Sequence, residues 1–81
     1  MKMQFEVTDT FGGEANYAWV RRESIELTED LSRRAVIHRL KKFAGLTNIR
    51  CMVTDMGDTI EVLPVGKNHP LVIAYVNFSW D

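Results

Sequence analysis

Cysteine is almost absent from this sequence of 81 residues, in which Cys51 stands alone. One thiol excludes an internal disulfide and every zinc pattern that requires two or more cysteines, and it favours a reducing, cytoplasmic environment. Histidine is also scarce: His38 and His69 are the only two, so the chain has no histidine-rich spacing for a metal ion. We therefore expect no metal site and no other cofactor.

Long apolar runs are absent too. No stretch approaches the roughly 18 apolar residues that suggest a membrane span, and residues 1–7 alternate polar and apolar side chains instead of forming the apolar run of a signal peptide. The chain lacks repeats, low-complexity tracts and linkers, while 46% of its residues are apolar. These features predict that residues 1–81 form one compact domain with a single core and no membrane partner.

The sequence has no excess of either charge, because its net charge is −1, but its charges are segregated. Residues 1–31 carry seven acids and three bases, residues 32–50 carry six bases and no acid, and residues 51–81 carry four acids and one base. The near-neutral total excludes a globally basic nucleic-acid binder. The central segment nevertheless forms a local cationic region between two anionic ones.

The N-terminal third has the period of two that is typical of strands. Residues 3–8 alternate apolar and polar side chains, which indicates a strand with one buried face. The glycine pair at 12–13 favours a hairpin turn because glycine adopts positive φ readily. A second strand is predicted over about 16–27, and its length allows a bulge or bend near residues 22–24.

A helix follows these strands. Either Thr28 or Ser32 can accept the unpaired amide hydrogens at its start, and Gly45 can end it after Ala44 in the left-handed conformation. At 100° per residue the apolar side chains share one sector and the basic ones cover the opposite side, which is typical of an amphipathic helix on a sheet. The apolar set is Val36, Ile37, Leu40, Phe43 and Ala44.

Three more strands are predicted, over 49–54, 59–65 and 71–80. Residues 55–58 form a hairpin turn signal, and Pro64 indicates an edge position or a strand end. The last strand is apolar on both faces, which favours a central place in the sheet. The order β-β-α-β-β-β without βαβ units predicts an α+β fold: an antiparallel sheet of four to five strands with one amphipathic helix packed on one face.

No catalytic constellation is visible in the sequence. His38 lies among cations, His69 lies in a loop before a proline, and neither has a nucleophile at a recognisable spacing. Asp55 and Asp58 suit a turn better than a calcium site, because the oxygen-rich spacing of a calcium loop is missing. We therefore predict that the protein is not an enzyme.

The best functional feature is the cationic side of the helix. A run of bases without one acid is less common than the mixed pairing that stabilises exposed helices, and it indicates an anionic partner or acids from elsewhere in the fold. Its candidate partner-binding residues are Arg34, His38, Arg39, Lys41 and Lys42.

A second candidate group lies on the second strand, where Tyr17 and Trp19 precede Arg21 and Arg22. Aromatic side chains next to arginines can stack on single-stranded bases, although a small domain also needs aromatics for its core. If Tyr17, Trp19, Arg21 and Glu23 share one face of the strand, the aromatic pair is half-buried and the charges emerge at the strand end.

Residues 9–22 read DTFGGEANYAWVRR. This segment resembles a family of short uncharacterised proteins of bacteriophages, prophages and other bacterial mobile elements, which carry a DTFGGEANYxWVRR-like motif near the start. The similarity continues through the basic helix and as far as Gly66, so it covers most of the chain. The resemblance implies a setting inside a bacterial cell and no particular mechanism. It adds the turn residue Glu14 to the candidate partner-binding residues.

Two hypotheses follow. The first is a non-enzymatic accessory protein of a phage or mobile element that binds a bacterial or phage protein complex, for example as an inhibitor of host defence of the anti-CRISPR kind. The second is a small nucleic-acid-binding module that uses the basic face of the helix with Arg21 and Arg22. A homodimer formed through an uncovered sheet edge is compatible with both.

Overall fold

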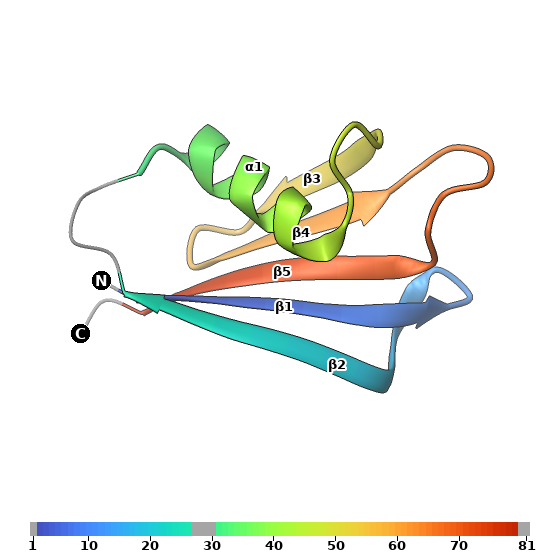
Figure 1. The fold of residues 1–81 in the computed structure, drawn as a ribbon, viewed down its shortest axis with the longest axis horizontal. Helices are drawn as coiled ribbons and strands as arrows, with labels where there is room; N and C mark the ends of the chain where they lie inside the picture. The colour runs from blue at the N-terminus through green and yellow to red at the C-terminus, as the bar shows by residue number, and fades with distance from the viewer. Residues whose placement is uncertain (1, 27–30, 80–81) are drawn as a thin grey trace.

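A computed structural model describes residues 2–26 and 31–79 of the chain, and these residues form five strands and one helix in the predicted order. The elements are β1 (Lys2–Phe11), β2 (Glu14–Glu26), α1 (Arg33–Ala44), β3 (Cys51–Asp55), β4 (Thr59–Pro64) and β5 (Val72–Ser79). Figure 1 shows α1 lying across one face of the sheet.

The sheet has the spatial order β2-β1-β5-β4-β3, and every neighbouring pair is antiparallel. This confirms the predicted α+β class and the five-stranded form of the sheet. Strand β5 lies third of the five, as its apolar residues on both faces predict. The N-terminal hairpin β1–β2 and the C-terminal hairpin β3–β4 are therefore joined through β5.

The core lies between α1 and the sheet. Alternate residues of β1 point toward the helix, so Met3, Phe5 and Val7 are buried while their neighbours face the other way. The helix contributes Val36 and Leu40, which are fully buried and lie one turn apart. The other members of this cluster are Leu46, Ile60, Val62, Ala74 and Val76.

The ends of α1 follow from local chemistry. The Ser32 side chain accepts a hydrogen bond from the amide of Ala35 at 3.1 Å, so Ser32 is the N-cap; Thr28, the alternative, lies outside the described residues. Gly45 ends the helix with a φ of 73°, and the amide of Leu46 donates to the carbonyl of Lys41 at 2.7 Å. This is the left-handed end that the sequence predicts.

The first hairpin turns tightly at its glycine pair. Phe11 pairs with Glu14, and Gly12 and Gly13 have φ values of 63° and 82°. Two successive positive φ values define the turn whose twist matches that of paired strands. The bulge that the length of the strand allows does not lie near 22–24: β2 pairs regularly with β1 from Val20 to Glu26, and the irregularity lies opposite Thr8 and Thr10.

The second hairpin differs from the prediction only at its boundaries. Strand β3 begins at Cys51 instead of at residue 49, because a turn closes first: the amide of Ile49 donates to the carbonyl of Leu46 at 3.1 Å. Pro64 marks a strand end and not an edge, since β4 lies between β3 and β5. Among the residues that the structure describes, no helix is long and apolar enough to cross a membrane.

Candidate macromolecule-binding surface

The six basic residues of α1, with His38 included, fall into two groups. Arg33 and Lys41 are used by the fold itself. The Arg33 guanidinium donates to the carbonyl of Gly57 at 2.6 Å, lies 3.7 Å from the Asp55 carboxylate and covers the Phe78 ring at 4.7 Å. The Lys41 ammonium donates to the carbonyl of Ile49 at 2.7 Å. Arg33 fastens the start of the helix to the second hairpin, and Lys41 fastens its end to the loop before β3.

The other group is free of such contacts. Arg34, His38, Arg39 and Lys42 are exposed, and none of them forms a hydrogen bond or ion pair within residues 2–26 and 31–79. The helical repeat places these four side chains within a sector of about 140° on the side of α1 that faces away from the core. We call these four residues the cationic helix surface. Lys41 was predicted to belong with them, but its ammonium is hydrogen-bonded to the loop before β3.

Arg21 joins the helix to β2. Its guanidinium lies over the Phe43 ring, 4.6 Å from the centroid, and donates to the carbonyl of Phe43. Phe43 in turn contacts the buried Phe5 ring, with 5.6 Å between centroids. A cation at the C-terminal end of a helix also complements the helix dipole. Arg21 therefore extends the cationic region toward β2, but its side chain holds the fold together.

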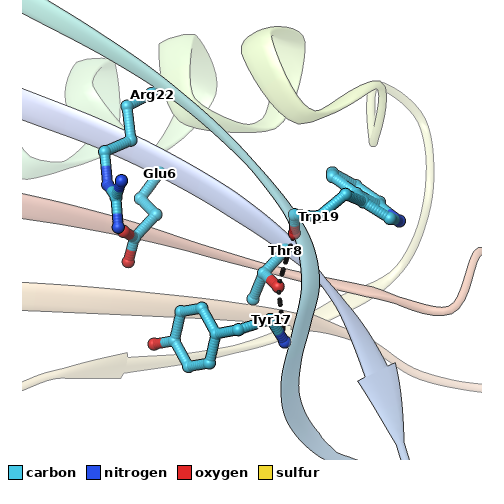
Figure 2. A network of polar contacts seen from close by, with 5 residues as sticks. All are labelled: Glu6, Thr8, Tyr17, Trp19 and Arg22. Carbon is cyan, nitrogen blue, oxygen red and sulfur yellow. Dashed lines mark hydrogen bonds and ion pairs between the residues drawn. The ribbon is translucent and has the colours of Figure 1, made fainter.

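Tyr17 and Trp19 do not share a face of β2. The backbone of Tyr17 has a φ of 57°, which is rare for a residue with a side chain, and Figure 2 shows the two rings leaving the strand in opposite directions. The condition that Tyr17, Trp19, Arg21 and Glu23 share one face is therefore not met. The reason is the local irregularity, because one reversed residue breaks the alternation along the strand.

A network of hydrogen bonds from Thr8 and Asp9 stabilises this irregularity. The Thr8 hydroxyl donates to the carbonyl of Trp19 at 2.9 Å and accepts from the amide of Tyr17 at 3.0 Å, as Figure 2 shows. The Asp9 carboxylate accepts from the Asn16 side chain and from the amide of Ala18, both at 2.9 Å. The bond from Asn16 above all, and then those from Ala18 and Thr8, hold the pKa of Asp9 below its usual 3.8.

This network explains why several residues of the segment 9–22 are needed to form the first hairpin. The aspartate and asparagine of this segment bind each other, its glycines make the turn, and its tyrosine occupies the reversed position. Glu14 stands at the turn end of β2, opposite Phe11, with an exposed side chain. Much of the motif therefore shapes the hairpin.

The face of the sheet opposite α1 is here called the open face. Arg22 lies on it and pairs with Glu6, with 2.7 Å between Nε and Oε1, and the Glu6 side chain is only 14% exposed. Tyr75 lies opposite Glu6 on the next strand. Burial first, and then Glu61, Tyr17 and Glu6 nearby, raise the pKa of Tyr75 above its usual 10.0.

Sequence reasoning missed an apolar hollow where the turn between β1 and β2 meets the chain that leads into β5. Phe11 is 80% exposed and Leu71 67% exposed at its rim, and the hollow has a volume of about 300 Å³ with Leu63, Pro64 and His69 in its lining. The amide of Thr10 donates to the carbonyl of Leu71 and ties the two segments together. The sequence does contain a sign of this hollow, because Phe11 and Leu71 are apolar residues next to turns, where polar side chains are usual.

The aspartates of the second hairpin act as turn residues. The Asp55 carboxylate accepts from the amide of Gly57 at 2.9 Å, two residues later, which is the local bond that favours aspartate in turns. Within residues 2–26 and 31–79, no group of three or more His, Cys, Asp or Glu side chains could hold a metal ion. Cys51 donates to the carbonyl of Ile49 at 3.3 Å, and burial raises the pKa of its thiol, an effect that Lys41 partly opposes.

Comparison with known proteins adds no relative: no family model, curated protein or solved structure gives a significant match to the chain.

Proposed function

We propose that this protein is a non-enzymatic accessory protein that acts by binding a macromolecule through the cationic helix surface. One observation carries the proposal: of the basic residues of the helix, Arg33 and Lys41 are fixed by the fold, whereas Arg34, His38, Arg39 and Lys42 have no partner among the described residues. Like charges three or four residues apart repel, so their grouping costs stability and favours an external anion.

The partner that fits best is an acidic surface of a protein. The whole chain carries a net charge of −1, and the exposed Glu23 lies on the helix side of β2, opposite the buried Phe5 of β1. This acid would repel the extended phosphate backbone of a nucleic acid, while a protein can present a local acidic patch. Complementary charges would speed association and align the two surfaces.

In the phage or mobile-element setting that the resemblance implies, such binding would serve to inhibit a host defence complex by covering one of its surfaces. An 81-residue protein without a catalytic constellation can act in this way by occlusion alone. The partner would then be a bacterial protein assembly, of the kind that anti-CRISPR proteins inhibit.

A second candidate function is nucleic-acid binding by the same four side chains. The helix of 12 residues is about 18 Å long, so its exposed cations can reach several successive phosphates. Such binding would be insensitive to sequence and would weaken steeply as salt rises.

Affinity capture from bacterial lysate separates the two functions. The tagged protein is compared with the Arg39→Gln/Lys42→Gln variant, and with Arg50→Gln/Lys67→Gln as a control that removes the same two charges elsewhere. Glutamine keeps the helix propensity of arginine and lysine. We expect to capture a partner protein that stays bound after nuclease treatment. The amount captured should fall by about tenfold or more in the Arg39→Gln/Lys42→Gln variant only, as expected for about 1 kcal/mol per lost ion pair.

Loss of the bound material on nuclease treatment would instead select the nucleic-acid function. Equal capture by both double variants would contradict a role for the cationic helix surface in either function.

A further inference from the structure

The two edges of the sheet differ in a way that the proposed function does not use. Strand β2 is an edge of 13 residues that carries charged side chains along its length, including Arg21, Arg22 and Glu23. Strand β3 is the other edge, and its residues 51–54 carry no charge at all. On β3, Met52 is 54% exposed and Val53 41% exposed. Charged side chains are a common guard against edge-to-edge pairing, and β3 lacks this guard over most of its length.

Among residues 2–26 and 31–79, the backbone of β3 has hydrogen-bonding groups without a partner at alternate residues. The amide of Met56 donates to the carbonyl of Thr59 at 2.8 Å, and the amide of Val65 donates to the carbonyl of Arg50 at 3.0 Å. In an antiparallel ladder bonded and non-bonded pairs alternate, so the even-numbered residues from 50 to 56 bond to β4. The amides and carbonyls of Cys51, Val53 and Asp55 therefore point away from β4, toward the edge.

These outward groups form a self-complementary set. We propose that a second copy of this chain pairs with β3 in antiparallel orientation about a twofold axis through Val53. Val53 then faces Val53 of the other copy, and Cys51 faces Asp55 in both directions. All three outward residues exchange their amide and carbonyl bonds in this register. Met52 faces Thr54, an uncharged pair, so exposed apolar surface is buried without opposing like charges.

The charges of the molecule are compatible with this pairing. Asp55 is the only charge on β3, and it lies 3.7 Å from Nε of its own Arg33. The helix packs mainly over β5 and its neighbours, so five strand spacings of about 4.8 Å separate the two helices in the pair, about 24 Å in all. This separation exceeds the Debye length of about 8 Å at physiological salt, and repulsion between the two cationic helix surfaces is screened.

Pairing about this axis joins the two sheets and places both helices on the same side. The dimer would present two cationic helix surfaces to one partner. The pairing itself depends only on β3 and stands whether or not the proposed function holds.

Sedimentation velocity over protein concentrations from about 5 µM to about 500 µM tests the pairing, because dimerisation depends on concentration. We expect the mean mass to rise from that of one chain toward twice that value. Val53→Lys should hold the protein at the mass of one chain throughout, because two lysines would meet at the axis. The control Ser24→Lys places the same charge on the β2 edge and should leave the dimer intact.

A charge-swap mixture tests the register. The Val53→Lys chain and the Val53→Glu chain should each stay monomeric alone, and an equimolar mixture should restore the dimer, since lysine then faces glutamate. Restoration also shows that both chains are folded. Any of three results would overturn the proposal. The wild-type chain could stay monomeric at the highest concentration, Ser24→Lys could abolish the dimer while Val53→Lys does not, or the charge-swap mixture could fail to associate.

Discussion

Two charged side chains pair with each other on the open face of the sheet, whereas the side chains of the cationic helix surface are unpaired within the described residues. On the open face, Arg22 and Glu6 bind each other at 2.7 Å, and the Glu6 side chain is largely buried. On the helix side, the four side chains of the cationic helix surface have no partner among the described residues. Charges that the fold pairs internally contribute to the fold, whereas charges left unpaired are available to something outside it. The predictions below test this division.

The largest effect is expected beneath the helix. Leu40 is fully buried between α1 and the sheet, so Leu40→Ala should lower the free energy of unfolding by about 2–5 kcal/mol, through lost burial and a cavity. The exposed neighbour Arg39→Ala should change it by no more than about 0.5 kcal/mol. Urea denaturation followed by circular dichroism measures both. Comparable losses would mean that the exposed side of the helix is part of the fold.

The next effect separates two adjacent arginines. Arg33→Gln should lower the free energy of unfolding by about 1–2 kcal/mol, since it removes a hydrogen bond, an exposed ion pair and a cation–π contact. Arg34→Gln should have an effect of less than about 0.5 kcal/mol. The same denaturation experiment compares them. A larger loss from Arg34→Gln would break the division of the helix cations into two groups.

A smaller, pH-dependent effect is expected at the first hairpin. The pKa of Asp9 is below 3.8 in the folded chain, so its contribution to stability is present above pH 3.8 and is lost as the pH falls through the folded pKa. Asp9→Asn should therefore lower the melting temperature at pH 7, and the difference from the wild type should shrink below pH 3.8. A difference that stays constant across this range would show that the carboxylate charge plays no part in the network.

The smallest effect concerns Tyr75 on the open face. Because burial is the main cause of its raised pKa and Glu61 the next, Glu61→Gln should lower the pKa of Tyr75 while leaving it above 10.0. Since the folded pKa is raised, the stabilising contribution of this group is present below pH 10 and is lost above it. Titration of the Tyr75 ring resonances by NMR gives the value. An unchanged pKa would place Glu61 too far from the ring to affect it.

Much of the fold was predictable because it follows from local periodicity. The alternation of Met3, Phe5 and Val7, the apolar sector of α1 and the position of Gly45 each determine one element, and the structure agrees with all three. The place of β5 at the centre of the sheet followed from its apolar residues on both faces.

The rest depends on contacts between distant residues. The position of the irregularity is set by Thr8 and Asp9, which bind groups seven or more residues away, and no local pattern on β2 reveals it. The division of the helix cations was equally hidden, because Lys41 and Arg33 find their partners in the second hairpin and its flank. Charge alone marks the six bases as equivalent, whereas their contacts distinguish them.

The central claim is that the cationic helix surface is where the partner binds. Amide chemical-shift mapping of the labelled chain with its captured partner tests it most directly, because both faces of the sheet are observed in one spectrum. We expect perturbed amides at Arg34, His38, Arg39 and Lys42, with Glu6, Arg22 and Tyr75 unchanged. Perturbation of the open face with an unchanged helix would contradict it.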